Sequence, residues 1–297
     1  MMSEKPTNEE VLAAVEKAGW LLEQKAVRLL EISDFHPRPG WAFQDPDKPE
    51  SSRELDVWGY HQFLNDRENK VIVSATMLVE CKQSASPFCA VGRELPSWRQ
   101  NGNPKEHTLF TDEVSTEIAP GTFQMKPSWD YFEFGELATR HGFSGFRADQ
   151  LTRLERPQKT WQASNAEIFT SLVMPLAKAI LATKKEYRNG ENRRTFNGVR
   201  QSYLTLNLCF PVVLIGSPLY VVDADKEEPQ VDMRDWVRAR RDIASKSVNG
   251  IFEFDVVTVG NFAKYMNNLV IPFCEAVAEL VAAEPLRFTR EKLDNAE

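Results

Sequence analysis

The segment 71-VIVSATMLVECKQ-83 joins a continuous apolar run to a charged end. Its β-branched and apolar residues predict a buried strand. Because side chains alternate along a strand, Glu80 and Lys82 leave on one face, whereas Val79 and Cys81 point to the other. A carboxylate and an ammonium are therefore expected side by side at the end of a buried element, where charge is costly unless it has a use.

A second strand and a polar turn precede this segment. Residues 54–60, ELDVWGY, are rich in apolar and aromatic residues and favour a strand that carries Asp56. Residues 65–69, NDREN, are typical of a turn. An antiparallel hairpin is the simplest connection, and it would place Asp56 close to Glu80.

A helix with acidic residues is predicted before the hairpin. Thr7 and Glu10 have the spacing of a capping box, and apolar residues then recur at helical intervals over residues 8–32. Glu16 and Glu23 lie two turns apart on the flank of this apolar stripe. Glu16 is expected in solvent, whereas Glu23 has two places open to it: solvent, or a neighbouring acidic site.

The expected neighbourhood of Asp56 and Glu80 suits a metal ion. Two close carboxylates are ionised together only when a cation lies between them. Their oxygen atoms suit Mg²⁺ or Mn²⁺ better than zinc. Lys82 could orient or deprotonate a water molecule, or stabilise charge on a phosphate, and these parts together can hydrolyse a phosphodiester. The alternative for Lys82 is a plain surface ion pair with Glu80.

The order of a helix acid, a strand Asp and a strand Glu-x-Lys resembles the PD-(D/E)xK nuclease superfamily, which includes type II restriction enzymes. The resemblance covers about the first 90 residues. It implies that Asp56 and Glu80 are metal ligands, that Lys82 is the catalytic lysine and that Glu23 is an auxiliary acid. Gln83 also resembles a residue often found after this lysine.

One part of the motif is missing, because Leu55 rather than proline precedes Asp56. The resemblance implies a Mg²⁺- or Mn²⁺-dependent endonuclease that acts on DNA more than on RNA, in restriction, phage defence or repair, as a homodimer or with a partner subunit. Two alternatives stay open. One is a catalytically silent protein that keeps the fold to bind nucleic acid or protein, and the other is a subunit that is active only in a complex.

Positive charge gathers at the end of a second predicted helix, over residues 164–188, which Ser164 and Glu167 would cap. The net charge of −7 argues against a protein that coats nucleic acid, but it leaves room for a local basic groove. The candidate phosphate contacts are Lys184, Lys185, Arg188, Arg193, Arg194 and Arg200. The helix dipole explains the first three without nucleic acid, but not the last three.

The remaining pattern completes the predicted fold. Two apolar runs over residues 204–223 are expected as strands joined by a tight turn, and residues 251–259 as a further strand. The basic run 234–246 is expected as a helix whose charged face is either solvated or the second wall of a basic groove. Residues 262–283 are expected as an amphipathic helix.

We expect a single α/β domain over residues 1–297, with a mixed central sheet flanked by helices and a restriction-endonuclease-like core. Its core motif covers 8–92, an insertion covers about 93–160, and 161–290 complete the sheet and helices. The four cysteines form no metal or disulfide pattern and are expected in the core. No apolar run approaches ~20 residues and the first residues lack a signal-peptide pattern, so we expect a cytoplasmic protein without a membrane partner.

Overall fold

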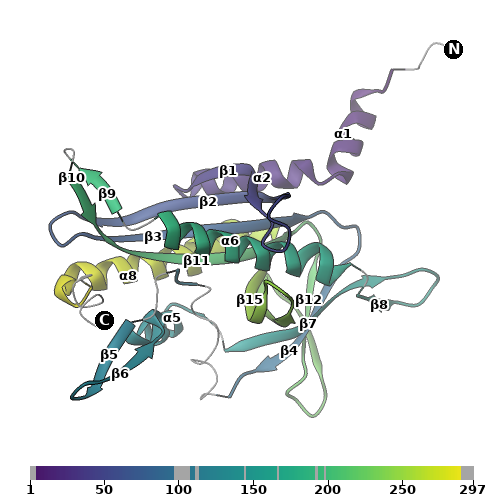
Figure 1. Ribbon diagram of the computed structural model, residues 1–297. Helices are drawn as coiled ribbons and strands as arrows, with labels where there is room; N and C mark the ends of the chain where they lie inside the picture. Colours follow the sequence, from purple (N-terminus) through teal and green to yellow (C-terminus); the bar gives the residue numbers. More distant parts are fainter. Residues whose placement is uncertain are drawn as a thin grey trace.

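The computed structural model describes residues 5–96, 108–110, 114–143, 145–165, 167–190, 193–196 and 199–288. In this part of the chain, a mixed sheet of eleven strands is flanked by helices (Figure 1). Parallel and antiparallel neighbours both occur in it. The predicted α/β class with a mixed central sheet is therefore confirmed.

The main sheet is a single path of strands with one short strand at its side. In spatial order it contains β1 (His36–Gln44), β2 (Ser52–Asp66), β3 (Val71–Lys82), β11 (Leu204–Ile215), β15 (Asn249–Thr258), β14 (Trp236–Ala244), β7 (Phe146–Glu155), β4 (Phe88–Glu94), β12 (Leu219–Asp223) and β13 (Gln230–Met233), with β8 (Gln162–Ser164) beside β7. Two further hairpins are β5 (Val114–Ala119) with β6 (Thr122–Lys126), and β9 (Arg193–Phe196) with β10 (Val199–Ser202).

The helices cover this sheet or project from it. They are α1 (Asn8–Lys17), α2 (Trp20–Ile32), α4 (Ser128–Tyr131), α5 (Phe134–Arg140), η2 (Phe169–Val173), α6 (Met174–Gly190), η3 (Val259–Asn261), α7 (Phe262–Tyr265), η4 (Met266–Val270), α8 (Ile271–Ala283) and η5 (Pro285–Phe288).

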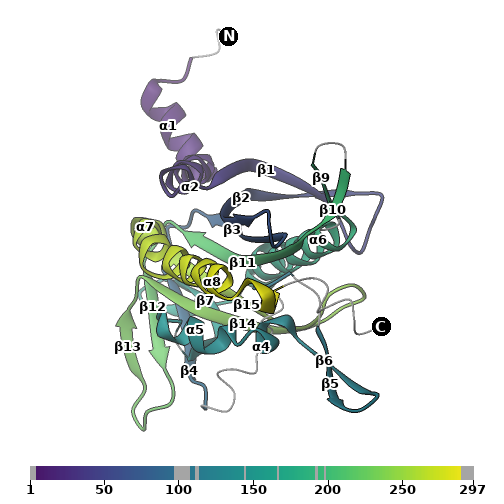
Figure 2. The ribbon, with the colours of Figure 1, turned by 90° about the vertical axis from the view of Figure 1, so that its left-hand side faces the viewer.

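The core lies on both faces of β3, which is buried along its whole length except at Lys82. On one face, Leu30 of α2 and Phe273 of α8 pack in the same cluster as Met77. On the other face, Ile180 of α6 packs in a cluster with Leu78. Figure 2 shows α8 and α6 on opposite sides of β11. Apolar layers on both faces explain why β3 and β11 read as continuous apolar runs rather than alternating ones.

The helix predicted over residues 8–32 is divided into two. The capping box of Thr7 and Glu10 forms at the start of α1, as predicted. Gly19 then takes a positive φ of 89°, which glycine adopts at little cost, and α2 starts in a new direction. Figure 1 shows α1 projecting away from the body of the protein, and none of its residues is buried.

The helix predicted over residues 234–246 is wrong, because Trp236–Ala244 form the strand β14. Val237, Ala239 and Ile243 are buried and alternate with polar side chains, which is the period of a strand. Charged partners on neighbouring strands stabilise the arginines between them. Arg238 pairs with Asp255 through two hydrogen bonds of 2.9 and 2.8 Å.

One other prediction differs from the structure. Ser164 ends β8 and Glu167 has a positive φ of 63°, so the predicted capping box does not form. The two strands predicted over residues 204–223 form as β11 and β12 of the main sheet and are joined by residues 216–218, although they are not neighbours, because β12 lies between β4 and β13. Within the range 93–160, expected as an insertion, β7 occupies a place inside the main sheet between β14 and β4.

All four cysteines are buried and free. Among the described residues, one helical stretch, Val259–Ala283, is long and apolar enough to cross a membrane. The same stretch supplies Tyr265, Phe273 and Val277 to the core, where they are 0–1% exposed. Core helices of this kind pass the same test of length and composition, so the stretch is weak evidence for a membrane span.

Candidate functional site

The hairpin of β2 and β3 brings Asp56 to the charged end of β3. The two strands are antiparallel, and their register pairs Val57 with Val79, so Asp56 follows at the position opposite Glu80. The Oδ2 atom of Asp56 accepts a hydrogen bond of 2.6 Å from the backbone N–H of Cys81. The predicted antiparallel hairpin is therefore confirmed, and Asp56 is held against the backbone that carries Glu80 and Lys82.

Lys82 turns toward the acids. Its Nζ atom lies 3.1 Å from Oε1 of Glu80. The Glu80 side chain is only 8% exposed, whereas the Lys82 side chain is 34% exposed. A plain surface pair would expose both partners, so this pair joins a buried carboxylate to an ammonium that solvent can still reach.

Burial and mutual repulsion raise the pKa values of the two strand acids. Burial, followed by the negative charge of Asp56, raises the pKa of Glu80 to about 7, and the charge of Lys82 opposes this shift. Burial also raises the pKa of Asp56, although the N–H of Cys81 and the charge of Lys82 lower it. Both carboxylates are thus held where a second positive charge would favour their ionised forms.

Glu23 lies within electrostatic reach of this pair. Burial raises its pKa, and the negative charges of Asp56 and Glu54 raise it further. Glu23 is in the first turn of α2, directly after the change of direction at Gly19. Glu23 therefore lies beside the acidic site, which is the second of the two positions expected for it.

Glu54 is an acid of this neighbourhood that the sequence reasoning missed. It lies two residues before Asp56 on β2, is exposed, and raises the pKa values of Glu23 and Asp56 through its charge. Its spacing was the available signal, because residues two apart on a strand share a face. Glu16, by contrast, is exposed on α1, as expected.

Gln83 is exposed at the end of the same strand, close to Gly216 and Gly19. A Cβ atom on Gly216, just after β11, would lie 2.4 Å from Oε1 of Gln83, and one on Gly19 would lie 3.7 Å from its Cβ. The N–H of Gly216 donates to the carbonyl oxygen of Lys82 at 3.1 Å. This hydrogen bond holds the residue after β11 against the backbone that carries Lys82.

The donor set of this site fits magnesium or manganese. No group of three His, Cys, Asp or Glu side chains in the described residues is arranged to hold a metal ion. Magnesium, however, is commonly bound by one or two carboxylates and completes its shell with water and substrate phosphate. Asp56 and Glu80 supply two such carboxylates, and burial is the main cause of their raised pKa values, which a bound cation would lower.

The candidate phosphate contacts lie elsewhere. Lys185 is exposed on α6 and lines a cavity of about 840 Å³, and Lys184 before it is half-buried. The backbone places Arg188 in α6, Arg193 and Arg194 in β9, and Arg200 in β10, while their side chains lie outside the described part.

The hairpin of β9 and β10 is far from Lys82. It leads directly into β11, whose Leu204 pairs with Val71 at the start of β3, whereas Ile215 pairs with Lys82 at its end. The hairpin and Lys82 are therefore about 35 Å apart along β3, at ~3.3 Å per residue. Figure 1 shows the hairpin and α1 toward opposite ends of the molecule.

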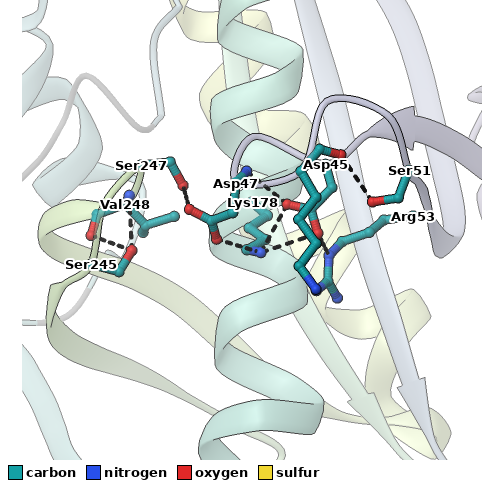
Figure 3. A network of polar contacts seen from close by, with 9 residues as sticks. Asp45, Asp47, Ser51, Arg53, Lys178, Ser245, Ser247 and Val248 are labelled. Carbon is teal, nitrogen blue, oxygen red and sulfur yellow. Dashed lines mark hydrogen bonds and ion pairs between the residues drawn. The ribbon is translucent and has the colours of Figure 1, made fainter.

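A second polar cluster ties the turn between β1 and β2 to the rest of the fold (Figure 3). The Nζ atom of Lys178 on α6 lies 2.9 Å from Asp45 and 2.6 Å from Asp47. Arg53 also pairs with Asp45, and Ser247 from the turn before β15 donates to Asp47. Although burial opposes the shift, the hydrogen bonds from Lys178 and Arg53 hold the pKa of Asp45 well below its usual range.

The comparisons with known proteins give no match: none of the family models, curated proteins or solved structures is similar enough to this chain.

Proposed function

We propose that this protein is a divalent-metal-dependent nuclease whose site lies at the end of β3. The convergence of Asp56, Glu80, Lys82 and Glu23 from one helix and two strands carries this proposal. These are the four residues on which the resemblance to PD-(D/E)xK nucleases depends. Their burial and mutual repulsion are a cost to the fold that a structural role does not require, whereas a metal-dependent site uses them.

Each residue has a separate part in this proposal. Asp56 and Glu80 would hold Mg²⁺ or Mn²⁺, which when bound polarises a phosphodiester and makes water more acidic. Lys82 keeps its ammonium beside Glu80 and faces solvent, where it can stabilise charge on a phosphate oxygen or hold a water molecule in line. Glu23 stands at the margin of the site and can accept a proton from, or orient, that water.

The distribution of charge favours duplex DNA as the substrate. The sequence places Arg193, Arg194 and Arg200 in the hairpin of β9 and β10, about 35 Å from Lys82 along β3. A duplex that rises ~3.4 Å per base pair covers this length in about ten base pairs. RNA is the second candidate, because metal-assisted hydrolysis acts on either backbone.

The test is cleavage of plasmid DNA, linear duplex DNA and single-stranded RNA by the purified protein with Mg²⁺, with Mn²⁺ or with EDTA. We expect the DNA to be cut with either metal and left intact with EDTA. Glu16→Gln serves as the matched control, because Glu16 is an exposed acid on the neighbouring helix. No cutting of any substrate, together with no Mn²⁺ bound at Asp56 and Glu80, would favour the catalytically silent alternative. Mn²⁺ binding without cutting would favour a subunit that needs a partner.

A further inference from the structure

A cleft of about 410 Å³ lies between the start of β14, the start of β7 and the helix η4. Its lining includes the aromatic side chains Phe143, Phe146 and Trp236 and the guanidinium groups of Arg234 and Arg238. The volume is within the range of small-molecule sites. None of the residues discussed for the nuclease site lines it.

Most of the charges in this cleft are neutralised by neighbours. Arg238 is held by both oxygens of Asp255, and the hydroxyl of Tyr265 donates to Asp255 at 2.7 Å. Asp235 pairs with Lys264 at 2.7 Å. Arg234 is the remaining charged residue in the lining of the cleft.

The positive charge of Arg234 is not neutralised by a neighbouring acid in the described part of the chain. Its guanidinium carbon lies 4.7 Å from the ring centroid of Phe146, and its backbone N–H donates to Leu219 at 3.0 Å. In the described residues it has no acidic partner. A half-exposed cation thus lies over an aromatic ring at the wall of a cleft whose other charges are paired.

We propose that this cleft binds a nucleotide, with its phosphate on Arg234 and its base against the aromatic wall. Arginine binds phosphate through paired hydrogen bonds, and both guanidinium planes and aromatic rings stack on bases. Trp236 is half-exposed. Its ring meets Tyr265 edge to face at 5.8 Å, and the ammonium of Lys264 lies 5.7 Å from its centroid, so both neighbours hold the ring in place. A bare anion would use only Arg234, and an apolar ligand would leave it unsatisfied.

The nucleotide could come from two sources that share this chemistry: a free mononucleotide, or an unpaired nucleotide of a bound strand. The cleft opens at the same end of the sheet as Lys82. Lys82 pairs with Ile215, Ile215 with Thr258, and Trp236 with Val257 in the next strand. Three strand spacings of ~4.8 Å therefore separate Lys82 from this part of β14, which is about 14 Å. A strand that lies along this edge could reach both places.

The test is isothermal titration of the full chain in EDTA with thymidine monophosphate, thymidine, inorganic phosphate and a ten-nucleotide oligothymidylate. The inference is independent of the proposed cleavage, because binding is measured without divalent metal. We expect thymidine monophosphate to bind more tightly than thymidine or phosphate, and Arg234→Gln to weaken it about tenfold or more. Arg234→Lys should retain part of the affinity, because it keeps the charge but loses the planar fork.

Arg156→Gln is the matched control, because Arg156 also lies over an aromatic ring, 5.8 Å from Trp161, and does not line the cleft. It should change binding less than twofold. Tighter binding of the oligonucleotide than of the monophosphate, lost in Arg234→Gln, identifies a strand as the source, and equal binding identifies a free nucleotide. No binding of the monophosphate or oligonucleotide by the folded wild-type protein, or binding that Arg234→Gln leaves unchanged, overturns the inference. So does phosphate binding as tightly as the monophosphate.

Discussion

At the scale of single residues, Lys82 has two roles to fill: it neutralises Glu80, and in the proposed mechanism it stabilises a phosphate. In the structure its ammonium lies 3.1 Å from the buried carboxylate of Glu80 and neutralises it. In the proposed mechanism the same ammonium would stabilise negative charge on the phosphate, while Asp56 and Glu80 bind one metal cation between them. The geometry permits both roles. Lys82 is the more exposed member of the pair, and a rotation of its side chain is enough to turn its ammonium from Glu80 toward solvent.

Replacement of Lys82 by methionine distinguishes the effect of Lys82 on cleavage from its effect on metal binding. We expect cutting to fall by about 10² to 10⁴, the usual size of an acid–base or charge-stabilising contribution. Mn²⁺ affinity should stay equal or rise, because a competing positive charge next to Glu80 has gone. Single-turnover cleavage and Mn²⁺ titration measure the two effects.

The control for this variant is Lys226→Met, because Lys226 is an exposed lysine that lines none of these sites. It should leave both cleavage and Mn²⁺ affinity unchanged. A Lys82→Met protein that cuts at the wild-type rate would remove Lys82 from the mechanism.

Asp45 predicts a pH dependence of stability. Its folded pKa lies below the ordinary value of 3.8, so its ion pairs stabilise the fold above pH ~4, and this stabilisation is lost as pH falls toward the folded pKa. Asp45 is 2% exposed, and loss of one partner of a buried pair costs about 3–5 kcal/mol. Asp45→Asn should therefore be less stable by that amount at pH 6, and the difference should shrink below pH 4.

Urea unfolding of the wild type and Asp45→Asn from pH 2.5 to 6.5 measures this difference. Asp232→Asn is the control, since Asp232 is exposed on β13, and it should stay within about 0.5 kcal/mol of the wild type. A difference between wild type and Asp45→Asn that does not change with pH would mean that the charge of Asp45 is not what stabilises the turn.

At the scale of elements, the close contact of β4 with β7 depends on one glycine. The register of these strands shifts between Val91 and Gly92, which marks a bulge. A Cβ atom on Gly92 would lie 2.1 Å from the carbonyl oxygen of Arg147 and 2.5 Å from Cα of Ala148. Both are backbone atoms, so neither can move aside without shifting a central strand.

Gly92→Ala should accordingly lower the free energy of unfolding by about 3 kcal/mol or more, at the upper end of overpacking costs. Gly260→Ala is the matched control, because a Cβ there meets nothing within 4 Å. That variant should be neutral or stabilised by up to about 1 kcal/mol through the unfolded state. Equal stability of the two variants in thermal or urea unfolding would contradict this account of the bulge.

The elements also show how far the sequence could be interpreted. The hairpin that carries Asp56 and Glu80 was predictable, because continuous apolar runs and a polar turn have few other solutions. The strand β14 was not, because its arginines hide the alternation unless their partners on other strands, such as Asp255 for Arg238, are known. The place of β7 inside the sheet depends on contacts with β14 and β4, which no local pattern encodes.

The candidate site divides in the same way. Asp56, Glu80, Lys82 and Glu23 could be named from spacing and chemistry. The hydrogen bonds from Cys81 to Asp56 and from Gly216 to Lys82 join residues that are remote in sequence, so only the folded chain shows them. The aromatic cleft at Arg234 could not be predicted from the sequence, because its lining residues are also remote from one another along the chain.

At the scale of the whole molecule, the basic hairpin of β9 and β10 lies about 35 Å from the site along β3. The screening length at physiological salt is ~8 Å, so charge on the hairpin would not act on a phosphate bound at the proposed site. We therefore expect the hairpin to contribute affinity and not chemistry.

The double variant Arg193→Glu and Arg194→Glu tests this separation. Affinity for a duplex of about twenty base pairs should fall, and the slope of log affinity against log salt should decrease by about 2. Cleavage of bound duplex under single-turnover conditions should stay within about twofold of the wild type. A loss of the bound-state rate would place the hairpin nearer to the chemistry than the sheet register implies.

The most direct test of the central claim compares cleavage of plasmid DNA in Mn²⁺ by the wild type and by Glu80→Gln, with Glu16→Gln as the control and folding checked by circular dichroism. Glu80→Gln keeps the shape of the side chain and removes the charge that would bind metal. We predict that the wild type and Glu16→Gln cut the plasmid and that Glu80→Gln is at least about 10³-fold slower. Cutting by Glu80→Gln at the wild-type rate would contradict the assignment of a nuclease site to the end of β3.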